Sequence, residues 1–198
     1  MKPKFIGLLA VGLIAGPMAA QAVTLQINGN GILTGASDVN VGGVLYDVQF
    51  LDGSCISLFT GCDKATDDFA FTTEADALIA AQALLGQVFT DTPFGQFDSV
   101  VDLTNGCTNS GLGACGVDIP YALGNVGVDV VDVVEVENFF VELADHVTQF
   151  PSTPDFDTTP NSAFTYAVWS LASVPEPGTL ALLGLGLLGL GLTRRRAN

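Results

Sequence analysis

Short apolar segments that alternate with polar residues begin soon after the start of the chain. They cover Leu25–Ile27, Ile32–Thr34 and Val39–Val41, with Asn and Gly residues between them. This pattern is typical of short β-strands. Gly42-Gly43 then separates the third segment from a longer one, Val44–Phe50. Because two adjacent glycines can both take positive φ, we predict a tight hairpin at this point.

One segment has the period of a helix instead. Thr73 is suited to cap its N-terminus, and Asp76 follows three residues later, near the positive end of the helix dipole. Gly86 is suited to end or fray it. The apolar residues that we expect on one face of this helix are Ala75, Leu78, Ile79, Leu85, Val88 and Phe89.

Beyond Pro93 the pattern returns to strands. Asn138–Phe150 fits the period of a helix and that of a strand, so its structure stays undecided. Pro151–Pro160 reads as a loop. We see no internal repeat and predict one small α+β domain, mostly β, with one principal helix. The strands predicted here are Phe97–Leu103, Asp118–Ala122, Val126–Val136 and Ala163–Leu171, the last of which contains Trp169.

The first 22 residues have the three parts of a secretory signal peptide. Lys2 and Lys4 form a positive region, Phe5–Ile14 is apolar, and Ala20 and Ala22 form a site of small residues for signal peptidase. We expect cleavage after Ala22. The alternative is a retained membrane anchor or a buried helix, and glycines within the short apolar stretch argue against it.

The other end of the chain has a second apolar segment, flanked on both sides by distinctive residues. Val174, Pro175, Glu176 and Pro177 precede an uncharged Leu/Gly run, 178–193, and three basic residues follow it. As a helix, this run would span roughly 24 Å, which is short of the roughly 30 Å hydrocarbon core. The basic residues, which favour a cytoplasmic C-terminus, are Arg194, Arg195 and Arg196.

These three parts together resemble the PEP-CTERM sorting signal of Gram-negative bacteria. The alternative is a plain tail anchor with a Pro-rich turn. The resemblance covers about 25 residues, and it implies recognition by an exosortase in the inner membrane and cleavage near the motif. It also implies an association with bacteria that produce exopolysaccharide and form biofilms. We therefore divide the chain into a signal peptide (1–22), an exported β-rich domain (23–173) and a sorting signal with a transmembrane helix (174–198).

All four cysteines lie in the exported domain, which suggests a disulfide framework. We favour Cys55 with Cys62 and Cys107 with Cys115, because each pair closes a short loop that contains glycine. Bridges of this length would fix loops more than they hold the fold together. A zinc site is the alternative, but the spacings are longer than those of most zinc motifs.

The charge of the domain excludes some partners. Residues 23–174 hold 20 acids and one basic residue, Lys64, for a net charge near −19. Nucleic acid binding depends on Lys and Arg, so we expect no nucleic acid partner. Anionic membrane surfaces should repel the domain as well.

Candidate catalytic chemistry is sparse. His146 is the only histidine, and its neighbour Asp145 is adjacent in sequence only. Pairs of carboxylates can hydrolyse glycosides, but among 20 acids a pair is expected by chance. We therefore expect no catalytic residue, no cofactor and no enzymatic activity.

Two acidic clusters could hold a calcium ion, since hard cations prefer oxygen ligands. Neither has the spacing of a known calcium loop. We expect a solvated acidic surface and no metal site. The clusters are Asp63, Asp67 and Asp68, and Asp129, Asp132 and Glu135.

The function predicted is that of an exported surface or matrix protein, structural or adhesive and non-enzymatic, which exosortase processes after transient inner-membrane anchoring. Extracellular polysaccharide is its expected partner. The alternatives are a secreted carbohydrate-active enzyme and a calcium-dependent adhesin module. A deep cleft with two carboxylates would favour the enzyme.

Overall fold

The structure is a computed structural model that describes residues 22–62, 69–108, 111, 113–124, 130–140 and 144–173. Residues 1–21 of the predicted signal peptide, the whole predicted sorting signal 174–198 and the acidic cluster at 63–68 lie outside these residues. Within them, no helix has both the length and the apolar character needed to cross a membrane.

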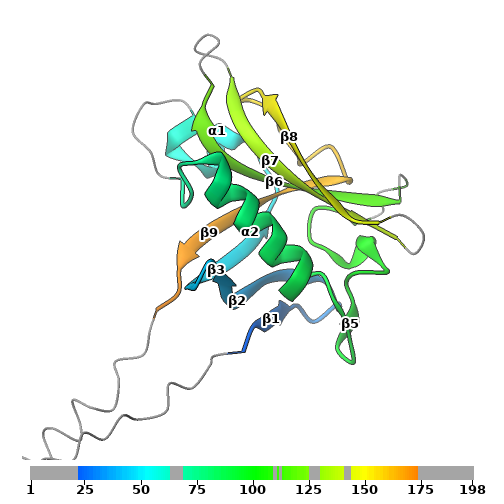
Figure 1. Ribbon diagram of the computed structural model, residues 1–198. Helices are drawn as coiled ribbons and strands as arrows, with labels where there is room; N and C mark the ends of the chain where they lie inside the picture. Colours follow the sequence, from blue (N-terminus) through cyan, green and yellow to red (C-terminus); the bar gives the residue numbers. More distant parts are fainter. Residues whose placement is uncertain are drawn as a thin grey trace, which may run out of the picture.

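A mixed sheet forms the centre of the described domain (Figure 1). Its order is β1-β2-β3-β9-β6-β7-β8, and every neighbouring pair is antiparallel except β6 and β9. Its strands are β1 (Thr24–Ile27), β2 (Leu33–Val41), β3 (Val44–Leu51), β6 (Ala114–Leu123), β7 (Val131–Phe139), β8 (His146–Ser152) and β9 (Phe164–Leu171). The remaining elements are α1 (Cys55–Leu58), η1 (Thr60–Cys62), α2 (Glu74–Gln87), β4 (Asp91–Thr92), β5 (Gly95–Gln96) and η2 (Val101–Leu103).

The hairpin predicted at the glycine pair joins β2 to β3. Val41 pairs with Val44, and Gly42 and Gly43 have φ of 60° and 96°. The two segments predicted before it belong to the single strand β2, whose register shifts near Asp38. Asp38 has φ of 61°, and its N–H donates to Asp47 Oδ1 at 3.1 Å. This bond supports the irregularity that lets one strand continue through a polar interruption.

The predicted cap and helix are confirmed in α2. Thr73 Oγ1 accepts a hydrogen bond from the Asp76 N–H at 3.2 Å. The predicted buried face is confirmed in part, because Val88 and Phe89 are buried and Leu78 and Leu85 pack against the core, whereas Ala75 and Ile79 are exposed. Small side chains bury instead, which allows the helix axis to lie close to the sheet. The residues of the helix that are buried are Ala77, Ala80, Ala81, Ala83 and Leu84.

The strand predicted over Phe97–Leu103 is also wrong. A turn interrupts it: the Asp91 carboxylate accepts hydrogen bonds from the Asp98 N–H, the Ser99 N–H and the Ser99 hydroxyl. The segment continues into the short helix η2 instead of pairing with the sheet. Phe97 is fully buried, so its apolar character reflects core packing.

The last third of the domain is β-structure. The undecided segment is a strand at both ends, since β7 runs to Phe139 and β8 begins at His146. β8 includes Pro151 and Ser152, which the prediction had placed in a loop. The predicted final strand is confirmed as β9.

The two faces of the sheet carry separate apolar clusters. Figure 1 shows α2 lying across one face, where Val134 and Val136 of β7 join the larger cluster. The opposite face holds the smaller cluster, with Val131 and Val133 of β7 and residues of α1 and η1. All members of both clusters lie between Val23 and Trp169, so the body carries its own core. The domain is thus mostly β with one main helix, as predicted.

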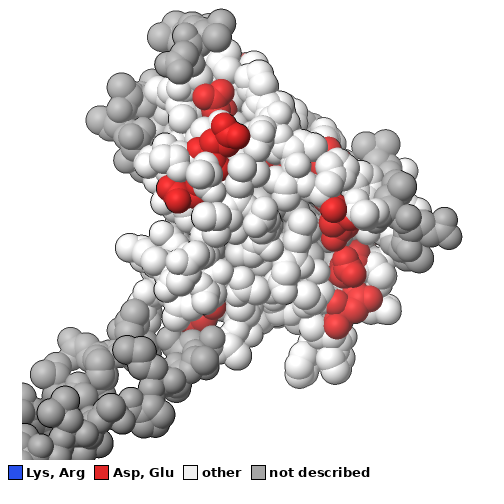
Figure 2. All heavy atoms as spheres, viewed as in Figure 1, with Lys and Arg blue, Asp and Glu red and all other residues white. Residues whose placement is uncertain are grey.

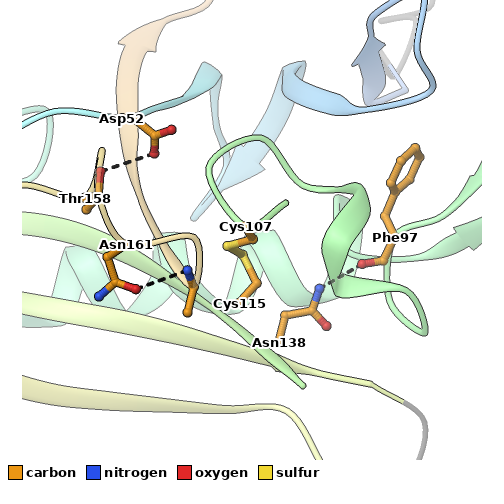
Figure 3. The surroundings of a disulfide bond; sticks show 8 residues. Asp52, Phe97, Cys107, Cys115, Asn138, Thr158 and Asn161 are labelled. Carbon is orange, nitrogen blue, oxygen red and sulfur yellow. Dashed lines mark hydrogen bonds between the residues drawn. A yellow bond between two sulfur atoms is a disulfide. The ribbon is translucent and has the colours of Figure 1, made fainter. Parts of the chain in front are cut away.

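Both predicted disulfides are present. Cys55–Cys62 closes the loop that contains α1, and Cys107–Cys115 ties the segment after η2 to β6. Figure 3 shows the second bridge beside Asn138, the register partner of Cys115 on β7. Asn138 Nδ2 donates to the Phe97 carbonyl at 2.8 Å. The bridge and this bond together hold the irregular segment before β6 against the sheet.

Removing the second bridge should destabilise the body moderately. The cysteines are eight positions apart, and closing a loop of this length contributes about 2–3 kcal/mol to the free energy of unfolding. We expect Cys107→Ala with Cys115→Ala to lose about that amount in urea denaturation at pH 7. The reduced wild-type protein should unfold at a still lower urea concentration. An unchanged midpoint for the double variant would contradict the structural role of this bridge.

Candidate functional site

The chain enters and leaves the body at the same end of the sheet. β1 runs parallel to β3, and β9 runs antiparallel to both, so the start of β1 lies at the end where β9 finishes. Figure 1 shows both at one end of the molecule. β9 stays paired to its last residue, and the Ala172 N–H donates to the Leu45 carbonyl at 3.0 Å. The predicted sorting residues begin immediately beyond this last bond.

A second candidate site, away from the chain ends, is a pair of buried carboxyl groups. Asp118 on β6 and Glu135 on β7 are register partners, and their side chains are 0% and 4% exposed. Side chains alternate along a strand, so Glu135 and Glu137 share the face opposite α2. Glu137 Oε2 lies 2.9 Å from His146 Nε2 on β8. Three acids thus follow one another from the interior to the surface.

The two innermost carboxyl groups lack other donors. Apart from the contact between the two carboxyl groups themselves, no hydrogen-bond donor of the described protein reaches Asp118 Oδ1, Asp118 Oδ2 or Glu135 Oε2. Burial raises the pKa of Asp118, although the hydrogen bond with Glu135 partly lowers it. Burial, and then the charge of Asp118, raise the pKa of Glu135. Two carboxyl groups in hydrogen-bonding contact are favourable when a proton lies between them, so near neutral pH we assign the pair a proton that Glu135 donates to Asp118.

A cavity of about 310 Å³ lies against this pair, and we call it the acidic cavity. Gly116 leaves room for it, because a Cβ there would lie 2.6 Å from the Phe164 ring and 3.1 Å from Glu135 Oε2. The other wall residues are half-buried, so the cavity is open to solvent. The residues that line it are Asp118, Glu135, Glu137, Thr148, Phe150, Ser152, Phe156 and Phe164.

The spacing of the pair does not match that of glycoside hydrolases. Those enzymes hold their carboxyl groups about 5 Å apart, or about 6.5–9.5 Å apart, to admit a sugar carbon or a water. Asp118 and Glu135 are in hydrogen-bonding contact with each other. The pair therefore leaves no room for a glycosidic bond between its two members.

In the described part of the chain, His146 contacts Phe139 and Glu137. Its ring stacks on Phe139 with centroids 5.3 Å apart, and its Nε2 faces Glu137. Asp145 turns to the backbone instead, where its Oδ1 accepts from the Phe139 N–H at 2.8 Å. The four cysteines are in disulfides. His146 thus lies next to Glu137, the outermost of the three acids Asp118, Glu135 and Glu137.

The two acidic clusters considered for calcium lie largely outside the described residues. Asp63, Asp67, Asp68 and Asp129 lie outside them. Asp132 and Glu135 are three positions apart on β7, which puts them on opposite faces of the sheet. Across the part of the chain that the structure describes, no group of three His, Cys, Asp or Glu side chains is arranged to hold a metal ion.

Sequence reasoning missed Asp118. It was read only as the start of a predicted strand, although a single acid within the apolar run Gly116–Pro120 is unusual in a buried strand. An acid that interrupts an apolar run is thus the feature of the sequence that indicates a buried carboxyl group here. Its partner across the sheet could not be identified without the register.

Figure 2 shows acidic groups on the visible face of the body and no basic side chain. All six Lys and Arg residues of the chain lie outside the described ranges. The described protein therefore has no Lys or Arg to pair with its acids.

Comparison with known proteins bears on the C-terminal segment. The model of the PEP-CTERM protein-sorting motif matches residues 173–196, a range that includes the predicted motif Val174–Pro177 and the arginines Arg194–Arg196. Searches of curated proteins and of solved structures found no match. The match makes this chain a PEP-CTERM domain-containing protein, with an exosortase recognition signal that follows directly on the last strand of its body.

Proposed function

We propose that the body is a non-enzymatic structural or adhesive component of the cell surface or the extracellular polysaccharide matrix, released there by exosortase. The observation that carries this proposal is the position of the sorting motif. Its match begins at residue 173, two residues after β9 ends. Cleavage at this junction would free the folded body without removing any strand of its sheet.

Several features of the body support export. Disulfides are stable in oxidising compartments outside the cytoplasm, and this body has two. Its N-terminal strand starts at the end of the sheet where β9 finishes. Signal peptidase and exosortase would therefore both act at one end of the domain, which faces the inner membrane before processing.

The candidate chemistry supports a non-enzymatic role. The Asp118–Glu135 pair has the wrong spacing for glycoside hydrolysis. In the described part of the chain, His146 faces Glu137, Asp145 turns to the backbone, and all four cysteines are in disulfides. A neutral polysaccharide is not repelled by an acidic surface, unlike nucleic acid. The two alternative functions, a secreted enzyme and a calcium-dependent adhesin, predict different results in the experiment below.

Co-sedimentation with exopolysaccharide from the producing strain tests this proposal. We expect the oxidised body, residues 23–173, to sediment with the polymer equally well with calcium and with EDTA. The reduced and heat-unfolded body is the control and should stay in solution. The polymer should keep its length, as measured by size-exclusion chromatography. Release of oligosaccharides would contradict the proposal in favour of an enzyme, and binding lost in EDTA would favour a calcium-dependent adhesin.

A further inference from the structure

The inner end of the acidic cavity holds two buried carboxyl groups and, among the described residues, no basic side chain to compensate them. Asp118 is fully buried, and apart from the proton that it shares with Glu135, no donor from the described protein reaches its carboxyl oxygens. Glu135 Oε2 is likewise buried and has no other hydrogen-bond donor in the described protein. A buried carboxylate is stable only when a proton or a cation compensates it. With no Lys or Arg in the described residues, a compensating cation would have to come from outside the fold.

The walls of the cavity suggest what kind of cation fits. The rings of Phe156 and Phe164 meet edge to face, with centroids 5.9 Å apart, and Phe150 also lines the space. Aromatic rings attract ammonium groups and cover the methylene groups attached to them. Thr148 and Ser152 add hydroxyl oxygens that can accept hydrogen bonds. A charged inner end and an aromatic wall are complementary to an amine on a short apolar stem.

A bare metal ion fits this cavity less well. The three acids of the cavity are not arranged as a metal-binding group within the described residues. Hard cations such as Ca²⁺ take six to eight oxygen ligands, and three phenylalanine rings supply none. The volume of about 310 Å³ also leaves room for the stem of an organic ligand.

We propose that the acidic cavity binds a small organic cation, a primary amine on an apolar stem. Its ammonium group donates hydrogen bonds to Asp118 and Glu135, and its stem lies against Phe150, Phe156 and Phe164. No covalent step is involved. This inference is independent of the proposed matrix function, and a separate experiment tests it.

Binding should be linked to proton release. Burial raises the pKa of both inner carboxyl groups, so the ammonium group must replace the proton that the free pair holds. A primary amine keeps its charge up to about pH 10. We therefore expect affinity to rise from pH 6 to pH 8. The titratable groups that face the cavity or its neighbours are Asp118, Glu135, Glu137, His146, Asp157 and Tyr166.

An NMR titration of the oxidised body, residues 23–173, with n-butylamine at pH 8 tests this proposal. We expect saturable shifts of the backbone amides of Thr148, Phe150, Ser152 and Phe164. Glu135→Gln should weaken binding at least tenfold, because it removes one charge while keeping the shape of the side chain. Asp132→Asn is the matched control, since it removes the same charge on the opposite face of β7, and it should bind within twofold of the wild type.

Butan-1-ol has the size of butylamine without its charge and should not saturate the site. Equal shifts with butan-1-ol, or equal affinity of the Glu135→Gln variant, would overturn the proposal. So would affinity that does not change between pH 6 and pH 8. Saturable shifts at the same amides with CaCl₂, with none from butylamine, would assign the cavity to a metal and also overturn it.

Discussion

Replacing Pro175, Glu176 and Pro177 with alanine is expected to leave the protein unprocessed and membrane-bound in a producing strain. Proline fixes φ and has no backbone donor, so the composition of the motif disfavours helix ahead of the apolar run. Alanine favours helix, so the substitution would change the backbone preference of the motif that exosortase is expected to recognise. Immunoblotting of membrane and medium fractions should show the change from a released, shorter form to a retained, longer one.

A loop proline in the body provides the matched control. Pro160→Ala lies in an exposed segment between β8 and β9 and should leave processing unchanged. Release of a shortened product from the triple-alanine variant, at the level of the wild type, would show that the motif does not direct processing. The body of that variant should keep both disulfides, which separates a sorting defect from misfolding.

Stability of the body should fall as pH rises from 5 to 7, and Glu135→Gln should remove about half of this fall, because Asp118 stays buried in the variant. Below pH 4 the pair is protonated in the folded and the unfolded protein, so it contributes no pH dependence. Above pH 4 the unfolded carboxyl groups ionise while the folded pair, whose pKa values are raised by burial, keeps its protons. The folded state then binds more protons, and each retained proton costs about 1.4 kcal/mol of stability per pH unit.

Over these two pH units, one retained proton changes the free energy of unfolding by about 3 kcal/mol. The glutamine amide can donate to Asp118 as protonated Glu135 does, so the variant keeps the hydrogen bond and loses only the proton that Glu135 retains. Urea denaturation at pH 5 and pH 7 measures both proteins. Asp132→Asn should retain the wild-type pH dependence. A wild-type protein whose stability changes between pH 5 and pH 7 by no more than that of the Glu135→Gln variant would show that Glu135 is ionised in the folded state.

Local signals in the sequence predicted much of the fold. Gly42-Gly43 specified a tight turn because few other residue pairs adopt two positive φ values at low cost, and the structure has this hairpin. Thr73 predicted the start of α2 because its hydroxyl satisfies a free backbone N–H. The cysteine pairs followed from short loops in an exported chain. In each case the information lies within a few residues.

Features that depend on distant contacts could not be predicted in this way. The buried face of α2 consists mainly of alanines, because the sheet below it leaves little space, and side-chain hydrophobicity alone favoured Ile79. The segment around Phe97 has strand-like composition, but the hydrogen bonds to Asp91 turn it away from the sheet. The Asp118–Glu135 pair requires the register of β6 on β7, which neither strand specifies by itself.

The intact mass of the protein released by a producing strain tests the central claim most directly. The predicted product begins at Val23, ends at or near Val174–Pro177, and is lighter by two hydrogens for each of its two disulfides. That mass would establish export, removal of both terminal segments and oxidation in one measurement. A product that retains residues 178–198, or that carries four free thiols, would contradict the account.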